Sequence, residues 1–371
     1  MWLLLTVLLG GELLAQPASL NLAATQLRQP APPADRVILV TLDGLRWQEV
    51  FGGVDDQMMN KEFGDVRNLP ELQSRFQKET PAASRESLMP FFWDTLASEG
   101  VVFGDPANNS SAAVTNGLNF SYPGYSEILC GFVDPRIDSN AKTNNPNVTV
   151  LEFINRQVGF EGQVSAFCSW DVFPWIINSD RSGIPVNAGW QSLRSNDHDT
   201  DSIVQLDQLQ SEFPHYWDNV RFDFFTFRAA EECLRHEQPR VLYVSLGETD
   251  DWAHGGRYDL YLDAAHRADD YIRRLWETAQ SMPEYRGRTT LIVTTDHGRG
   301  DNKVDWKSHG RDIAGCEQIW IAVLGAGVLK CDVNETQVTQ SQVASTVAAA
   351  VGLDYQSFAP QAAPPLPVFA K

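Results

Sequence analysis

The 371-residue chain has few cysteines for its length, and none of its five cysteines forms a Cys-x-x-Cys pair. This argues against a thiolate zinc site and against a dithiol redox motif. Cys316 and Cys331 are the two that could pair in an oxidising compartment. Most of the cysteines are expected to be buried as small apolar residues.

Basic residues are also scarce, with 29 Lys and Arg against 48 Asp and Glu and a net charge of −19. An acidic surface repels phosphate backbones and anionic lipid, which argues against broad nucleic-acid binding. A small anionic substrate is still compatible with this charge if the site carries its own cations. The absence of long like-charge runs and of short-period repeats gives no support for a solenoid or a propeller.

No apolar run reaches the roughly twenty residues needed to cross a bilayer. The run at the N-terminus is shorter and ends near Ala15, which predicts a signal peptide over residues 1–17. Two features are atypical, because no Lys or Arg precedes the run and Glu12 lies near its end. We expect a periplasmic or secreted protein with no integral membrane segment after signal removal, and a proline-bearing linker over residues 18–35.

Nearly unbroken β-branched and apolar runs alternate with helical patterns along the chain. The predicted strands lie within residues 36–44, 163–170, 240–248, 289–298 and 318–327. The predicted helices lie within residues 91–100, 149–157, 222–238, 257–282 and 341–352. This alternation predicts an α/β fold with three layers, α/β/α, around a mostly parallel central sheet.

The same reading predicts one catalytic domain over residues 36–357. Residues 171–220 are rich in Trp, Pro, Asn and Asp and show little periodicity. We interpret them as an insertion that folds over the sheet edge on the substrate side. Residues 358–371 are expected to be a proline-rich, loosely held tail.

Acidic and imidazole side chains follow the predicted strands. They are Asp43, Asp250, Asp251, His254, Asp296 and His297, with His309 in a loop shortly afterwards. One Asp-Gly pair is more often a turn, and one loop histidine is usually solvated or satisfied in a core. Because parallel strands bring their carboxyl ends to one sheet edge, however, these groups are expected to meet. Their charges would need compensating cations, and a thiolate-free Asp/His set suits two divalent metals, Zn²⁺ or Mn²⁺.

Ser121 lies in the stretch TNGLNFSYPGYSEILCG, residues 115–131. Taken alone, the segment after the serine favours a type II turn, with Pro and Gly at its centre, that caps a helix. A serine hydroxyl attacks poorly at neutral pH unless a base or a metal lowers its pKa. The predicted metal site would supply this activation, and it makes Ser121 a candidate nucleophile.

These motifs together resemble the alkaline phosphatase superfamily, and within it the branch of nucleotide pyrophosphatases/phosphodiesterases and phosphonoacetate hydrolases. The matching pieces are TLDG, SYPGYSEILCG, DDWAHGG, TDHGRG and SHGRD, in the family's order. They span roughly residues 36–352, and the ordered combination is specific although each piece is not.

The resemblance implies an alkaline-phosphatase-like fold and two metal sites. One metal would be held by Asp43, Ser121, Asp296 and His297, and the other by Asp250, His254 and His309. Asp250 rather than Asp251 has the family's four-residue offset to the histidine. Ser121 would attack phosphorus in line, and the phosphoserine would then be hydrolysed.

The sequence departs from the family pattern after the aromatic-Pro pair, where Gly124 and Tyr125 stand in place of Asn-His. The family also uses an asparagine some twenty residues after the nucleophile to hold a phosphoryl oxygen. The candidates are Asn140, Asn144 and Asn145, and we favour Asn140. On the substrate side, Trp170, Trp175 and Arg181 are the candidate binding residues, although an aromatic cluster there is equally a packing device.

Several alternatives share the fold or the site. Sulfatases need a C/S-x-P-S-R motif, and SYPGY has neither the second serine nor the arginine. A phosphonate hydrolase fits the same motifs. Cofactor-independent phosphoglycerate mutase needs a large inserted domain, for which the chain leaves little room. A secreted binding protein with a degenerate site is the alternative from another class. We predict a two-metal hydrolase of small phosphate mono- or diesters.

Overall fold

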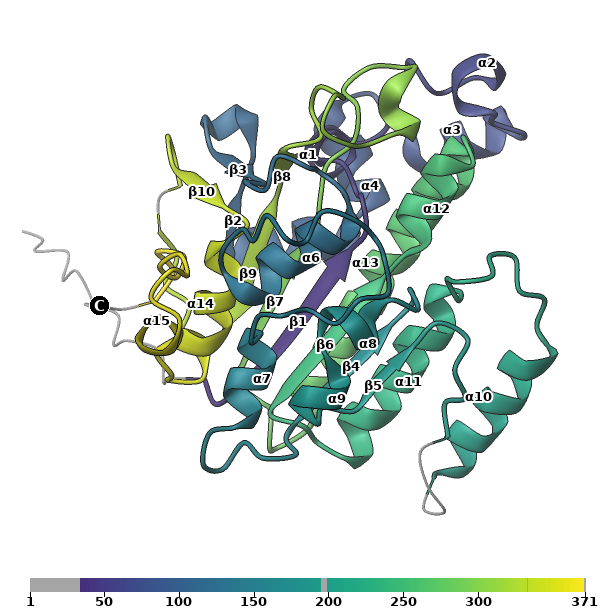
Figure 1. Ribbon diagram of the computed structural model, residues 1–371. Coiled ribbons are helices and arrows are strands. Elements are labelled where there is room, and N and C mark those ends of the chain that lie inside the picture. The colour runs from purple at the N-terminus through teal and green to yellow at the C-terminus, as the bar shows by residue number, and fades with distance from the viewer. Residues whose placement is uncertain (1–33, 195–198, 332, 370–371) are drawn as a thin grey trace, which may run out of the picture.

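A seven-stranded sheet runs through the middle of the computed structural model, which describes residues 34–194, 199–331 and 333–369 (Figure 1). The strand order is β2-β9-β7-β1-β6-β4-β5. Its strands are β1 (Arg36–Leu42), β2 (Val101–Phe103), β4 (Val164–Cys168), β5 (Val186–Ala188), β6 (Val241–Leu246), β7 (Thr289–Thr294) and β9 (Ile321–Gly325). The predicted signal peptide and most of the predicted linker lie outside the described residues.

Five adjacent strands, from β7 to β5, are parallel, whereas at the other edge β9 pairs antiparallel with both β7 and β2. Side chains of β1 alternate between two cores: Val37 and Leu39 face one, and Ile38, Val40 and Leu42 face the other. Since both faces are covered, the strand can be apolar along its whole length. The sheet is therefore mostly parallel, as the sequence predicted.

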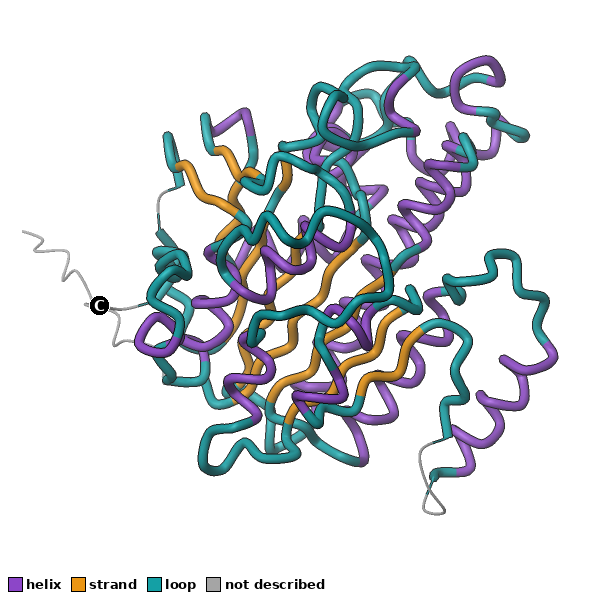
Figure 2. The backbone as a smooth tube through the Cα atoms, viewed as in Figure 1, coloured by secondary structure: helices purple, strands orange, loops and turns teal. Residues whose placement is uncertain are grey.

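Helices cover both faces of the sheet and form the outer layers (Figures 1 and 2). One face packs against α6 (Ser121–Cys130), α7 (Val150–Asn155), α8 (Phe173–Ile176), α14 (Gln342–Ala350) and α15 (Tyr355–Phe358). The other packs against α1 (Trp47–Gly52), α3 (Leu69–Phe76), α4 (Pro81–Leu88), α11 (Asp223–His236), α12 (Glu248–His254) and α13 (Tyr258–Ser281). The predicted three-layer α/β/α architecture is confirmed.

Shorter elements complete the layers. They are helices α2 (Lys61–Gly64), α5 (Ala97–Glu99) and α9 (Ser179–Ser182), a π-helical turn at Phe92–Leu96, and 3₁₀ turns at Pro106–Asn108 and Asp305–Lys307. A second sheet has the order β10-β3-β8, from strands Gln337–Thr339, Ser111–Ala113 and Gln318–Ile319. Each predicted strand range contains a strand, and each predicted helical range contains a helix. In the range 91–100 the helical structure consists of the π-helical turn and α5.

The insertion at residues 171–220 contributes more regular structure than expected. It supplies β5 as the edge strand of the main sheet, together with α8, α9 and α10 (Asp201–Glu212). Leu206 of α10 packs with Phe225 and Ala229 of α11 in a small separate core. In Figure 1, α10 lies at the margin of the molecule, beyond α11.

The C-terminal tail is not loosely held as far as residue 369, and that prediction is wrong. Ala359, Ala362, Leu366 and Val368 are buried in the core on the α14 side of the sheet. Phe369 pairs with Val328 in an isolated β-bridge. A proline-rich segment can pack in this way because its apolar side chains still gain from leaving water.

The described residues contain no helix that is both long and apolar enough to span a membrane. Cys316 is buried as a free thiol, so the Cys316–Cys331 disulfide that the sequence allowed is not formed. The other expectation for the cysteines holds, because Cys130, Cys168, Cys233 and Cys316 are all buried.

Candidate metal centre

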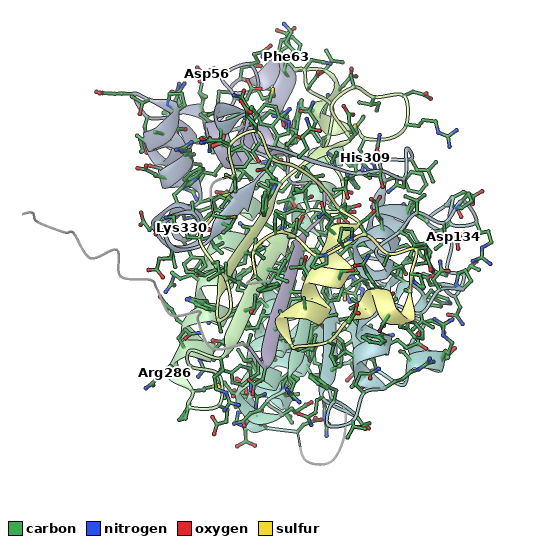
Figure 3. The ribbon with its side chains drawn as sticks, turned by 90° about the vertical axis from the view of Figure 1, so that its left-hand side faces the viewer. Asp56, Phe63, Asp134, Arg286, His309 and Lys330 are labelled. Carbon is green, nitrogen blue, oxygen red and sulfur yellow. The ribbon has the colours of Figure 1, made fainter. Side chains whose placement is uncertain are left out.

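The site forms where three neighbouring strands end. β1 lies between β6 and β7, so the residues that follow these strands meet at one edge of the sheet. Asp43 follows β1, α12 follows β6, and Asp296 and His297 follow β7. His309 enters from the loop beyond β7, and Figure 3 shows it near this end of the molecule, far from Arg286 at the opposite end.

The first group of side chains is buried around His297. Its Nε2 lies 3.3 Å from Oδ1 of Asp43 and 3.5 Å from Oδ2 of Asp296. Ser121 Oγ lies 3.5 Å from the same nitrogen. The carboxylate oxygens and the imidazole nitrogen lie within 4.8 Å of one another, close enough to bind one cation together.

The second group lies beside it and is more open to solvent. His254 Nε2 is 3.2 Å from Oδ2 of Asp250 and 2.9 Å from Nε2 of His309. His309 Nε2 is also 3.6 Å from Oδ1 of Asp250. Asp250 Oδ1 is 4.0 Å from His297 Nε2, so the two groups adjoin. All seven side chains predicted as ligands are thus brought together, and their roles as ligands stay predictions.

The protonation of two imidazoles follows from their outer contacts. His297 Nδ1 lies 2.9 Å from the carbonyl oxygen of Gly298, and His309 Nδ1 lies 3.1 Å from that of Asn119. A carbonyl oxygen only accepts hydrogen bonds, so each Nδ1 carries a proton. In the neutral ring this leaves a lone pair on Nε2, the atom that faces the carboxylates, as in metal-ligating histidines.

Within the first group, two buried carboxylate oxygens have no hydrogen-bond partner among the described residues: Oδ1 of Asp43 and Oδ2 of Asp296. The other oxygen of each is held, by the hydroxyl of Tyr125 at 2.9 Å and by the N–H of Gly44 at 3.1 Å. The orphaned oxygens are the ones nearest His297. Buried polar atoms are seldom left unsatisfied, and oxygen and imidazole donors of this kind fit Zn²⁺ or Mn²⁺.

The electrostatics of the cluster also call for a cation. Burial, and then repulsion by Asp250, raises the pKa of Asp43 well above its usual range. Burial and repulsion by Asp43 do the same to the pKa of Asp296. Burial lowers the pKa of His297 to about 4, and the pKa of His309 also falls well below the usual range. Neutral imidazoles are the form that binds a metal, and a cation would relieve the repulsion between the carboxylates.

Arg299 is a site residue that the sequence reasoning missed. Its guanidinium is fully buried and pairs with Asp250 Oδ1, while Nε and Nη2 donate to the carbonyls of Trp306 and Lys307. Burial alone would raise the pKa of Asp250, but Arg299 and His254 lower it well below its usual range. Arg299 is the arginine of the quoted motif TDHGRG, so its place in that motif was the available signal.

Gly44 makes room for this pair. Its φ is +59°, and a Cβ there would lie 2.7 Å from Nη1 of Arg299 and 2.9 Å from Oδ1 of Asp250. Both the left-handed backbone and the close approach favour glycine. The TLDG motif therefore supplies a ligand, Asp43, and the space beside it.

Ser121 is the first residue of α6, and the segment after it is helical rather than a type II turn. Pro123 fits in the first turn because its missing N–H would have no helical partner there. Gly124 lets the helix approach the β7 end, since a Cβ would lie 2.4 Å from the carbonyl oxygen of Asp296. Tyr125, next along, orients Asp43. The Gly-Tyr pair thus packs α6 onto the site.

Asn140 lies at the wall of the cavity that contains Ser121 and both groups. Its Oδ1 accepts the N–H of Tyr122 at 2.9 Å, so Nδ2 is left as the donor. Asn145 is buried elsewhere, with Nδ2 3.2 Å from Ser126 Oγ, and does not line this cavity. Asn144 does not line it either.

The three predicted substrate-side residues are placed differently. Trp170 lines the cavity, whereas Trp175 and Arg181 do not. Arg181 forms an ion pair with buried Glu152 at 2.8 Å and donates to the carbonyls of Asn145 and Asn147. These contacts indicate that Arg181 anchors the loop that precedes α7.

Residues 49–349 match the type I phosphodiesterase / nucleotide pyrophosphatase family. No curated protein matches the chain. Among solved structures, this chain resembles wild-type alkaline phosphatase PafA. The two chains are 10% identical, the TM-score is 0.56, and the match covers 88% of this chain and 97% of that chain. It also resembles the zinc complex of the C-terminal periplasmic domain of EptC from Escherichia coli, with 12% identity, a TM-score of 0.55, and 92% and 91% covered.

A further likeness is to the lipoteichoic acid synthase LtaP from Listeria monocytogenes, with 9% identity, a TM-score of 0.52, and 86% of this chain and 72% of that chain covered. These likenesses establish an alkaline-phosphatase-like fold. The family match indicates a hydrolase of phosphate esters. The chain belongs to the type I phosphodiesterase / nucleotide pyrophosphatase family.

Proposed function

We propose that the protein is a two-metal hydrolase of small phosphate mono- or diesters that works through a phosphoserine on Ser121. The observation that carries the proposal is the position of the Ser121 hydroxyl. Its Oγ lies 3.5 Å from His297 Nε2, beside the two buried carboxylate oxygens that lack a partner. A hydroxyl beside such a cluster is suited to activation as a nucleophile.

The residues present fit two divalent cations, with Zn²⁺ preferred and Mn²⁺ the alternative. Asp43, Ser121, Asp296 and His297 would hold one of them. Asp250, His254 and His309 would hold the other. When bound, such ions lower the pKa of a hydroxyl and stabilise charge on a leaving oxygen.

Ser121 Oγ loses its proton to solvent and attacks phosphorus, and the bond from phosphorus to the ester oxygen breaks. The leaving alkoxide takes a proton from water. A second water then attacks the phosphoserine, which releases phosphate, or a phosphate monoester when the substrate is a diester, and restores Ser121. Asn140 Nδ2 would donate to a nonbridging oxygen, and the N-terminus of α6 favours negative charge there.

Replacing Ser121 by Ala tests the nucleophile. We expect turnover to fall by about a thousandfold or more, because Ser121 has the one hydroxyl among the described residues that line the cavity. Two zinc or manganese ions per chain should remain, measured by elemental analysis. Ser126→Ala, on the same helix, is the matched control and should keep its activity. Near wild-type turnover by Ser121→Ala would refute the nucleophilic role.

A substrate panel separates the alternatives. p-Nitrophenyl phosphate, bis-p-nitrophenyl phosphate, p-nitrophenyl sulfate and a phosphonate ester should be compared with added zinc or manganese. We expect the phosphate esters to be hydrolysed fastest. A faster sulfate or phosphonate reaction would favour those alternatives, and a protein without metal or turnover would favour the binding protein.

The proposal includes a periplasmic or secreted location, supported by the apolar N-terminus. Cell fractionation combined with N-terminal sequencing of the mature protein tests it. We expect the chain outside the cytoplasm to begin near residue 18. A cytoplasmic chain that retains Met1 would contradict this location.

A further inference from the structure

The outer wall of the catalytic cavity contains a positively charged side chain, Lys142, that has no role in the proposed reaction. The cavity has a volume of about 350 Å³, at the small end of ligand sites. Four carboxylates line it, from Asp43, Asp171, Asp250 and Asp251. Among the described lining residues, Lys142 is the one with a permanent positive charge.

Lys142 is held at the wall rather than pointing freely into solvent. Its Nζ lies 2.6 Å from Oδ2 of Asp171 and 5.3 Å from the centre of the Trp175 ring. The side chain is 47% exposed, so the ammonium is half open to an incoming anion. Trp175, which does not line the cavity, thus acts on it through Lys142.

Lys142 also lies two residues after Asn140, and both line the same cavity as Ser121. One loop therefore supplies an amide donor and an ammonium to the space in front of the nucleophile. Charge-assisted hydrogen bonds to phosphate are roughly twice as strong as neutral ones. The two groups are suited to binding nonbridging oxygens of one phosphoryl group.

We propose that Lys142 is a specificity-determining residue that makes the site prefer phosphate monoesters to diesters. This inference rests on the proposed function. Near neutral pH a monoester carries close to two negative charges and a diester carries one. Because Coulomb attraction grows with charge, a cationic side chain in the cavity wall favours a dianion over a monoanion. The additional charge of the monoester then has Lys142 as its counter-charge.

Asp171 tunes this preference. It competes with the substrate for the ammonium, and its Oδ1 is buried with no partner among the described residues. Removal of Lys142 would leave the Asp171 carboxylate uncompensated at the cavity wall, where it repels a dianion more than a monoanion. Neutralising Asp171 should act in the opposite direction by freeing the ammonium.

The test compares Lys142→Met, Asp171→Asn and wild type by the ratio of kcat/KM for p-nitrophenyl phosphate to that for bis-p-nitrophenyl phosphate. We expect Lys142→Met to lower this ratio by about tenfold, the value of one charge-assisted hydrogen bond. Asp171→Asn should raise it. Lys330→Met is the matched control, since Lys330 lies across the molecule from His309 and donates to the Ser98 carbonyl (Figure 3).

A second readout does not depend on turnover. Calorimetry with inorganic phosphate compares Ser121→Ala with the double variant that also carries Lys142→Met. The double variant should bind phosphate about tenfold more weakly. An unchanged affinity would overturn the inference.

The outcomes separate this inference from the proposed function. Suppose that Ser121→Ala abolishes turnover but Lys142→Met leaves the monoester-to-diester ratio of kcat/KM unchanged, for example by lowering both activities equally. In that case the role of Lys142 is overturned and the proposed function stands. A wild-type preference for the diester would overturn the role of Lys142 as well. If the wild type hydrolyses neither ester, the proposed function fails, and the phosphate affinities alone decide whether Lys142 binds the anion.

Discussion

Carboxylates line several cavities of this molecule, and two of these cavities differ in how their carboxylates are satisfied; the smaller of the two is the candidate site. The larger, of about 700 Å³, lies between the π-helical turn and α13. There, buried Asp269 accepts the N–H groups of Phe91 and Phe92, each at 2.8 Å, and Asp270 pairs with Arg273. In the smaller cavity, by contrast, Asp43 has a buried oxygen with no partner.

The difference shows that neither size nor acidity marks a binding site. The carboxylates named in the larger cavity are satisfied by the protein itself, so they need nothing further. The buried oxygens of Asp43 and Asp296 are satisfied by no other described group, and an added cation would stabilise them. Unsatisfied buried charge is thus the informative feature.

Among the changes that test this comparison, the largest expected effect comes from closing the space beside the unsatisfied cluster. In Gly44→Ala the new Cβ would displace Arg299 from Asp250, and we expect metal affinity and activity to fall by about tenfold to a hundredfold. Metal titration and esterase assays measure this. Gly287→Ala is the matched control, because φ is +69° there and nothing lies within 4 Å of a Cβ. Equal losses in both variants would show that backbone strain alone is responsible.

Removing one charge should stabilise the metal-free protein more in the smaller cavity than in the larger one. Asp43→Asn keeps an acceptor for Tyr125, ends the repulsion, and should raise the free energy of unfolding by about 1 kcal/mol or more. It should also abolish stabilisation by added zinc. Asp269→Asn also removes a buried charge, since burial raises the pKa of Asp269 to about 7, but it leaves one backbone N–H facing an amide, so the free energy should rise by less than in Asp43→Asn. Urea unfolding in chelator measures both changes, and an equal change in the two variants would remove the contrast.

The smallest effect concerns the pH dependence of the metal-free protein. The pKa of His297 is about 4 when folded and near 6.5 when unfolded. As pH falls from 6.5 to 4, the unfolded chain binds a proton that the folded chain does not. Wild type should therefore lose stability relative to His297→Gln by at most about 1.4 kcal/mol per pH unit. Parallel stability curves for the two proteins would contradict the buried neutral imidazole.

Local patterns predicted much of the fold. The run at residues 36–42 is apolar on both faces, and the spacing of Leu262, Ala265 and Ile272 lines one side of α13. Each signal depends on the period of one element, so it survives without tertiary information. The tail and β5 were misjudged because their burial depends on surfaces supplied by distant parts of the chain.

The candidate ligands could be named from the sequence because parallel strands bring their ends to one edge, and because the order of the motifs is specific. The contacts that support them could not be named. Tyr125 reaches Asp43 across 82 positions, and Arg299 reaches Asp250 across 49. No periodicity encodes such pairs.

The sequence by itself thus determined the class of fold, the strands that deliver acidic and imidazole groups, and the family to which the motifs point. Tertiary structure alone decided which oxygens are left unsatisfied, which imidazole nitrogen faces the site, and which lysine reaches the cavity. The physical reason is that propensity and periodicity act between near neighbours in the chain, whereas burial and charge depend on everything nearby in space.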